Sequence, residues 1–266
     1  MRRIFIFSLL MLIGRLAYAQ ELYINTEPAS NMAAKSLGIR VENQGFFNPG
    51  FKNRSTLELM AGLNRAWMVH GSAYMSDFYG RNQRLEGGSV YAKYRFLSVD
   101  SVQRHFRGAA FVKASLSDNH VMNQEINLEG DNSAVQAGVV FTQLLHKLAL
   151  SSSLSYIRGF DNVGNAIPDG FARNVVAYTL SGGYLLLPKT YTDYDQLNFN
   201  LYFELLGKAN PGRGQSYLDA APGVQFIINS NTRIDLSFRT PLWSEMTRMT
   251  GNMYLVRLEY NLFNFL

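Results

Sequence analysis

The chain has 266 residues, with 25 Lys and Arg, 20 Asp and Glu, and no cysteine. The lack of cysteine excludes a disulfide framework, thiol chemistry and Cys-ligated metal sites. Three basic residues lie within the first 19 positions. Removing that segment leaves 22 basic residues against 20 acidic ones, a balance that does not indicate a nucleic-acid partner.

The first 19 residues have the pattern of a secretory signal peptide. Met1–Arg3 is a short basic region, residues 4–13 form an apolar run, and Ala17 and Ala19 flank Tyr18 before the predicted cleavage site. The apolar run is too short to cross a bilayer as a helix. We therefore expect residues 1–19 to be cleaved and the mature chain to be exported.

Residues 20–35 show no strand alternation before Lys35. This segment either folds into the interior of the following domain as a small plug or stays in the periplasm. The sequence leaves both alternatives open. The remaining domain is expected to cover residues 36–266.

Alternating apolar and polar residues predict strands through the rest of the chain. The clearest case places Phe199, Leu201 and Phe203 on one face and Asn200 and Tyr202 on the other. We expect twelve strands of the length needed to cross a bilayer at a tilt, at about 36–43, 55–63, 67–76, 87–97, 106–117, 133–143, 148–158, 174–186, 196–207, 217–228, 232–240 and 252–265.

The connections between these strands differ systematically in length. Those after even-numbered strands are mostly short, whereas those after odd-numbered strands, such as 118–132 and 159–173, are mostly long and rich in Asn, Gly, Asp and Pro. Short periplasmic turns opposite long external loops are typical of transmembrane β-barrels. The pattern predicts an all-β, antiparallel up-and-down barrel in the bacterial outer membrane with both termini periplasmic. Ten or fourteen strands, or a soluble sandwich, are the alternatives.

Two local features, a proline within a strand and the end of the final strand, lead to separate predictions. Pro222 falls inside the tenth strand, where a missing N–H disrupts a closed sheet, so we expect a bulge or the barrel mouth there. The final strand resembles the C-terminal strand of outer-membrane barrels, whose aromatic residues are recognised by the barrel-assembly machinery. We assign this assembly signal to Tyr260, Phe263, Phe265 and Leu266.

The polar faces of the strands predict a charged lumen. Twelve tilted strands imply a backbone diameter of roughly 24 Å and a passage of order 10 Å after side chains are added. These residues either line a solute path that favours anions or pair into an ionic core. The residues expected in the lumen are Arg40, Glu42, Glu58, His70, Lys93, Arg95, Arg107, Lys113, Glu204, Asp219, Arg233, Asp235, Arg239, Arg257 and Glu259.

Three segments carry a family resemblance: 26–32 (TEPASNM), 92–96 (AKYRF) and 221–223 (APG). They resemble outer-membrane barrels of Bacteroidota, which are similar to the transporter-like barrels grouped with meta-pathway phenol-degradation proteins. The resemblance implies a porin-like channel or transporter for small solutes in a Gram-negative outer membrane. Independently of the resemblance, we expect outer-membrane lipid, lipopolysaccharide and the barrel-assembly machinery as partners and no cofactor, and the sequence does not identify the solute.

An outer-membrane hydrolase and a structural or binding barrel without transport are the alternative functions. Barrel phospholipases use Ser, His and Asn, and His105, Ser115 and Asn119 occur in a suitable order. His105 and Ser115 would nevertheless lie roughly 34 Å apart along one strand, whereas nucleophile and base need to be in contact. The sequence therefore does not predict an enzyme.

The loop at 118–132 contains the only other candidate group. A barrel protease needs an Asp/His group at its external rim, and Asp118, His120 and Asp131 share this loop. Glu129 and Asp131 also offer oxygens that can bridge divalent ions to lipopolysaccharide. We expect these acids to lie on a solvated external loop.

Overall fold

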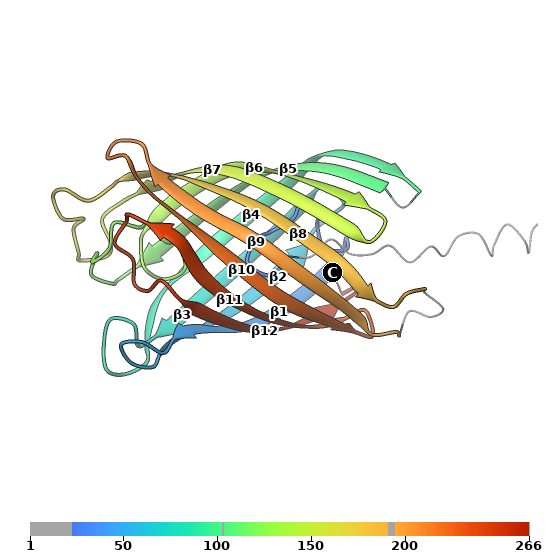
Figure 1. The fold of residues 1–266 in the computed structure, drawn as a ribbon, viewed down its shortest axis with the longest axis horizontal. Helices are drawn as coiled ribbons and strands as arrows, with labels where there is room; N and C mark the ends of the chain where they lie inside the picture. The colour runs from blue at the N-terminus through green and yellow to red at the C-terminus, as the bar shows by residue number, and fades with distance from the viewer. Residues whose placement is uncertain (1–22, 103, 191–194, 266) are drawn as a thin grey trace, which may run out of the picture.

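The computed structural model describes residues 23–102, 104–190 and 195–265. These residues form a closed antiparallel barrel of twelve strands (Figure 1), which confirms the predicted fold class. The signal peptide at 1–19, residues 20–22 and Leu266 lie outside the described residues. The strands are β1 (Ser36–Phe46), β2 (Lys52–Gly62), β3 (Trp67–Ser76), β4 (Arg84–Ser101), β5 (Arg104–Ser117), β6 (Ala134–Leu145), β7 (Leu148–Gly159), β8 (Asn174–Leu187), β9 (Asn198–Asn210), β10 (Gln215–Ile228), β11 (Thr232–Ser244) and β12 (Met253–Leu262).

Each strand pairs with its neighbours in sequence, and β1 pairs with β12 to close the sheet. The closing ladder runs from Leu37–Leu262 to Gly45–Tyr254. Just beyond it, the Phe265 N–H donates to the Lys35 carbonyl at 2.8 Å. Closure removes the unpaired edges that a β-sheet otherwise presents to solvent or lipid.

Several strand ends differ from the prediction. β4 and β11 run further than expected, and β9 and β10 extend until only residues 211–214 connect them. The long hairpins continue the ladder beyond the apolar belt, so hydrophobic alternation underestimates their length. β12 ends at Leu262, so Phe263 and Phe265 lie after the strand rather than within it.

Outward and inward residues alternate as they do in a membrane barrel. Leu154, Leu180 and Leu236 are exposed on the outer wall, whereas the residues that follow them, Ser155, Ser181 and Ser237, are buried in the lumen. Apolar outside and polar inside is the reverse of a water-soluble domain. No helix in the described residues is long and apolar enough to cross a membrane.

The expected bulge at Pro222 is not at the proline. Pro222 lies within β10, is exposed on the outer wall and pairs with Phe203 on β9. The β10–β11 register shifts earlier, between Leu218 and Asp219, and then passes from Ala220–Thr240 to Gly223–Ser237. Ser237 Oγ donates to the Pro222 carbonyl at 3.1 Å, so the backbone acceptor of this residue is satisfied by a side chain.

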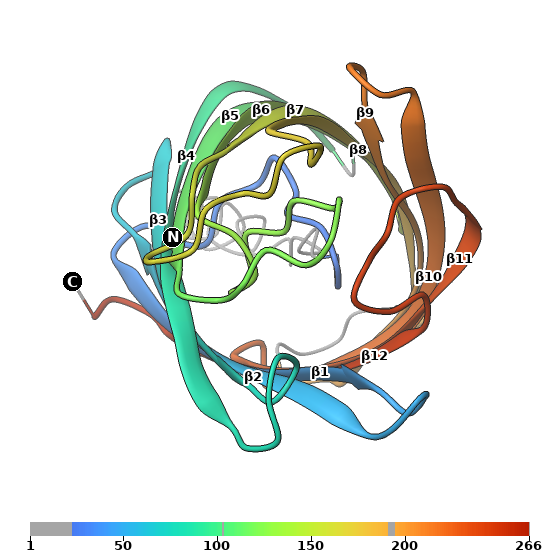
Figure 2. The same ribbon diagram turned by 90° about the vertical axis from the view of Figure 1, so that its left-hand side faces the viewer.

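The two ends of the barrel differ. The connections after odd-numbered strands gather at one end, here called the loop end, on the left of Figure 1; the opposite end is called the turn end. Seen from the loop end, 118–133 crosses the opening, and the blue N-terminal segment lies inside the barrel (Figure 2). The length rule has two exceptions, because 211–214 is short at the loop end and 188–197 is long at the turn end.

Adjacent residues of β8 test which face meets lipid. We expect Leu180→Arg to destabilise the barrel by about 2–4 kcal/mol, because Leu180 faces outward near the middle of the strand. Arg at the inward Thr179, which lines an internal cavity, should cost clearly less. Urea unfolding in lipid vesicles measures both, with Leu180→Phe as the apolar control. Equal losses at 179 and 180 would contradict the assigned facing.

Candidate solute path through the barrel lumen

The lumen has one wall without charge. The inward residues of β6, β7 and β8 are small or uncharged, and we call the following set the small wall: Thr142, Ser151, Ser153, Ser155, Ala177, Thr179 and Ser181. Arg158 is the only charged residue in these three strands, and it is exposed on the outer surface. Short side chains leave space beside this wall.

Across the lumen, β1, β2, β11 and β12 carry a first row of opposite charges. Arg40 lies opposite Glu58 on β2 and Glu259 on β12, and Glu259 lies opposite Arg233 on β11. Arg40 contacts Glu58 at 2.7 Å and Glu259 at 2.9 Å, and Arg233 contacts Glu259 at 3.2 Å. Direct cross-strand opposition therefore pairs every charge in this row.

A second row lies one pair of residues further towards the loop end. Arg257 on β12 lies opposite Glu42 on β1 and Asp235 on β11, at 2.5 and 3.3 Å. Asp235 also accepts from Arg233 at 3.0 Å, which joins the two rows, and from Gln225 at 2.9 Å. We refer to both rows together as the ionic rows.

Residues 23–33 lie within the lumen and meet both walls. Glu204 on β9 is fully buried and accepts five hydrogen bonds. Three come from the N–H groups of Ile24 and Asn25 and the Asn25 amide, at 2.8–3.1 Å; Thr26 donates the fourth at 2.7 Å and Ser181 the fifth at 3.1 Å. These contacts hold the start of the segment against β8 and β9.

The middle of the segment is held by charged residues. Glu27 lies 3.4 Å from Arg40 Nη1 and 3.5 Å from Lys93 Nζ. Burial acts to raise the pKa of Glu27, but the Lys93 and Arg40 charges outweigh it and lower the pKa to about 2. The charged contact is therefore fully present above the ordinary pKa of 4.5 and is lost only as the pH falls through about 2.

The segment separates two internal cavities. One cavity of about 270 Å³ lies between the segment and the loop at 118–133, with Ser153 and Thr179 on one side and Arg257 on the other. A second of about 110 Å³ lies between the segment and the turn end, and is lined by residues such as Arg107 and Phe263. We call them the upper and lower chambers. Thr26, Glu27, Arg40 and His70 line both.

The loop at 118–133 folds into the mouth of the barrel. Glu125 contacts Lys208 Nζ at 2.8 Å and accepts from the Tyr217 hydroxyl at 2.6 Å. Burial acts to raise the pKa of Glu125, but Lys208 and Arg239 outweigh it and lower the pKa to about 2. The loop is therefore held by an ionised carboxylate throughout the ordinary pH range.

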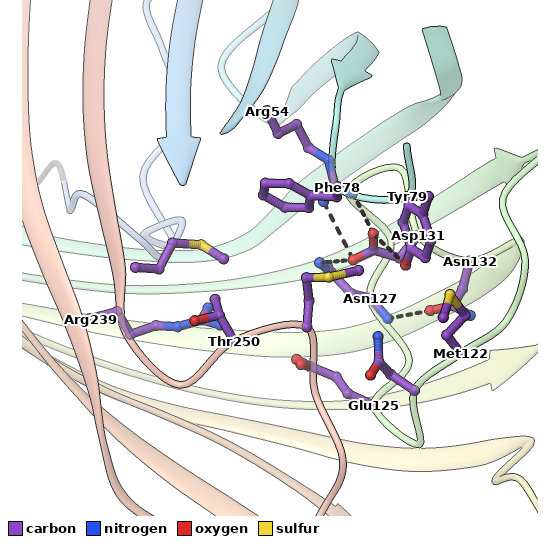
Figure 3. Close-up of a pocket in the computed structure, with 13 residues that line it drawn as sticks. Arg54, Phe78, Tyr79, Met122, Glu125, Asn127, Asp131, Asn132, Arg239 and Thr250 are labelled. Carbon is purple, nitrogen blue, oxygen red and sulfur yellow. Dashed lines mark hydrogen bonds and ion pairs between the residues drawn. The ribbon is translucent and has the colours of Figure 1, made fainter. Parts of the chain in front are cut away.

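Asp131 anchors the other side of this loop. Arg54 on β2, Tyr79 and Asn127 converge on its carboxylate (Figure 3). Tyr79 donates at 3.0 Å and Asn127 at 2.8 Å, while Arg54 also contacts Glu86 at 2.9 Å. A cavity of about 20 Å³ lies beside these contacts.

The prediction of a solvated external loop at 118–132 is therefore wrong for Asp131, while Asp118 is exposed and Glu129 is half-exposed. Asp131 is buried, and Glu129 accepts from Gln44 at 3.2 Å and lies 3.9 Å from Lys113. The basic side chains inside the barrel mouth draw the loop inward. Hydrophobic alternation carries no information about such a contact.

The other predicted lumen residues lie at different heights between the turn end and the loop end of the barrel. Arg107 donates to Ser30 Oγ at 2.8 Å at the turn end, and Arg239 contacts Asp219 at 3.0 Å near the loop end. His70 Nδ1 lies 3.5 Å from a carboxylate oxygen of Glu58. Arg95 lies in β4 near the turn end, beside a register shift with β5, and does not line either chamber.

The candidate hydrolase residues are not brought together. His105 Nδ1 bonds to Asp100 at 2.7 Å, at the turn end of β5. Ser115 donates to the Asn132 carbonyl at 2.6 Å, and the Asn119 amide donates to the Gly130 carbonyl at 2.8 Å. The latter two contacts hold the inward loop in place.

The acids and His120 of that loop also occupy separate positions. Asp118 forms an exposed ion pair with Arg84 at 3.2 Å, whereas Asp131 pairs with buried Arg54. His120 is exposed. Among the described residues, no group of three or more His, Asp and Glu side chains is arranged to hold a metal ion.

Comparison with known proteins identifies the fold. No family model matches the sequence, and a search of curated proteins gives no relative. The COG4313 outer membrane channel from Pseudomonas putida F1 matches with a TM-score of 0.59 at 11% identity, over 90% of this chain and 100% of that one. The NanC porin matches with a TM-score of 0.52 at 14% identity, over 85% and 100%. The chain thus has the fold of twelve-stranded outer-membrane channels.

The ionic rows predict a large effect from a small substitution. Asp235→Asn removes the carboxylate shared by Arg233 and Arg257, so we expect a loss of about 3 kcal/mol in the free energy of unfolding. This value is at the lower end of the range for breaking a buried ion pair, because Arg233 and Arg257 retain their contacts with Glu259 and Glu42.

Arg173→Ala is the matched control. Its ion pair with Asp161 is exposed, and such pairs contribute roughly 0–1 kcal/mol. Denaturant unfolding in detergent or vesicles measures both variants. A loss for Asp235→Asn no larger than that of the control would show that the ionic rows are not a buried network.

Proposed function

We propose that this protein is a porin-like channel for small solutes in the outer membrane of a Gram-negative bacterium. The observation that carries the proposal is the pair of chambers, stacked along a lumen that one segment of chain divides. A barrel that served only as a membrane anchor has no need of internal space on both sides of a partition. The shared fold of outer-membrane channels supports the same function.

The path follows the small wall. Ser153 and Thr179 line the upper chamber, and their short hydroxyl side chains offer hydrogen bonds without blocking it. Facing them, the ionic rows pair their charges, and the upper chamber has equal numbers of basic and acidic lining residues. This balance reduces the anion preference that the basic excess alone predicts, and favours small polar solutes that are neutral or zwitterionic.

A structural or binding barrel without transport is the second candidate. This alternative is favoured by the obstruction of the lumen, because residues 23–33 lie between the two chambers and residues 118–133 fold into the barrel mouth. We do not propose a catalytic role, since the His, Ser and Asn candidates make separate structural contacts.

Export and orientation are part of the proposal. Cleavage after Ala19 would deliver the chain to the periplasm, and both barrel termini, near Lys35 and Phe265, then lie at a periplasmic turn end. The outer wall contacts lipid and lipopolysaccharide. The resemblance to transporter-like barrels of Bacteroidota and to the meta-pathway phenol-degradation group belongs to the same proposal, supported by the segments at 26–32, 92–96 and 221–223.

The end of the chain is proposed as the signal for the barrel-assembly machinery. Tyr260, Phe263 and Phe265 are exposed, and Tyr260 faces outward from β12. We expect deletion of residues 264–266 to leave the protein exported but unfolded, because the signal and the closing contact at Lys35 are both lost. Heat-modifiable migration in gels measures folding. Normal migration of the truncated protein would contradict the assignment.

Two adjacent serines of β7 test the solute path. Ser153 lines the upper chamber, whereas Ser152 faces outward. We expect Ser153→Trp to reduce single-channel conductance in planar bilayers by at least half, and Ser152→Trp to leave it unchanged. Both are also measured in a background lacking residues 23–33, so that the partition does not hide the path. Equal conductance of the two variants, or no conductance from folded protein in either background, would contradict the channel.

A further inference from the structure

Residues 24–32 lie in the lumen as a bound peptide does. None of them belongs to a strand, and the barrel wall contacts their backbone N–H and C=O groups as well as several of their side chains. Arg257 donates to the Ile24 carbonyl at 2.6 Å, and Lys93 donates to the Pro28 and Ser30 carbonyls at 2.7 and 2.8 Å. On the small wall, Thr142 Oγ1 accepts from the Ala29 N–H at 2.9 Å.

The contacting residues come from around the barrel. Glu204 on β9, Arg257 on β12, Thr142 on β6 and Lys93 on β4 reach the segment from different sides. All four side chains are buried. Together they satisfy main-chain N–H and C=O groups of residues 24, 25 and 28–30, which is the chemistry of main-chain recognition. We call these four residues the peptide site.

Glu204 differs from the acids of the ionic rows. Each acid of those rows has an Arg partner, whereas the partners described for Glu204 are the uncharged donors of residues 24–26 and Ser181. A buried carboxylate needs several hydrogen bonds to remain ionised. The segment supplies four of the five, so the carboxylate and the segment depend on one another.

The segment in the peptide site lies across the proposed solute path. Thr26 and Glu27 line both chambers, so a single thickness of chain separates them. At the same level, the Thr26 hydroxyl lies 2.9 Å from Ser181 Oγ on the small wall. The segment therefore blocks the lumen beside the wall that we assign to the solute path.

We propose that residues 24–32 are a displaceable plug, bound in a lumenal site that recognises a peptide by its main chain and by the side chains of Asn25, Thr26 and Glu27, and that its release joins the two chambers into one channel. The ligand class of the site is such a peptide, supplied here by the protein itself. This inference rests on the proposed channel function. Among the described residues the chain connects the segment to the barrel through β1, and no residue of the segment takes part in strand pairing, so it can leave the site without breaking a ladder.

A reversible cross-link tests the plug. The natural chain has no cysteine, so the double variant Thr26→Cys with Ser181→Cys offers one possible bridge. The two oxygens replaced are 2.9 Å apart, and a disulfide needs about 2.05 Å between its sulfurs. We expect oxidised double variant to lose at least nine-tenths of its single-channel conductance or open time, and reductant to restore it. Each single variant is the control, and should show the same conductance in oxidant and reductant.

A second experiment supplies the ligand in trans. A variant lacking residues 23–33 should conduct several-fold more than wild type. A synthetic peptide of residues 23–33 should block it in a dose-dependent manner, while a peptide of scrambled order should not.

The outcomes separate this inference from the channel itself. Conductance that persists in the cross-linked protein, or a deletion variant that conducts no better than wild type, would overturn the plug and leave the channel standing. Conductance that rises on deletion without block by the peptide would overturn the peptide site. No conductance from any folded variant, the deletion included, would overturn both proposals.

Discussion

Closure of the sheet between β1 and β12 is the constraint on which the rest of the structure depends. In lipid every backbone N–H and C=O needs a partner within the protein, and a closed antiparallel sheet provides one for each strand. Closure also fixes the facing, because alternate side chains must point either to lipid or to the lumen. This alternation explains why Leu180 faces outward and the adjacent Ser181 faces the lumen.

The narrow lumen then determines how charge is arranged. A buried charge without a partner is costly, and the register of a closed barrel places inward residues of adjacent strands directly opposite one another. Arg40 thus meets Glu58 and Glu259, and Arg257 meets Glu42 and Asp235. Charge fills one side of the lumen, while the short side chains of β6–β8 leave room on the other.

Much of this architecture could be predicted from alternation and loop length. The twelve strands follow from the period-two pattern, and β3 even begins and ends where the pattern does. The ionic rows could also have been derived, because hairpin register sets Arg40 against Glu58 once the turn between β1 and β2 is known. The less accurate strand boundaries, such as the ends of β9 and β10, lie where the ladder continues past the apolar belt.

Contacts between segments that are distant in the chain could not be predicted from alternation and loop length. Glu204 and Ile24 are separated by 180 positions, and no local pattern connects them. The inward fold of 118–133 depends on Arg54, Lys113 and Lys208 being presented by three strands at one mouth. The bulge also lies at Leu218 and Asp219 rather than at Pro222, because a proline marks a missing N–H in the sequence but does not say where the register shifts.

The closed barrel holds its own residues 24–32 inside a charged lumen. Hydrogen exchange of the membrane-embedded protein measures this most directly, because the N–H groups of Ile24, Asn25 and Ala29 donate to Glu204 and Thr142. We expect these three amides to exchange far more slowly than those of the exposed connection at 47–51. Exchange at the rate of an unstructured peptide would show that the lumen does not hold the segment.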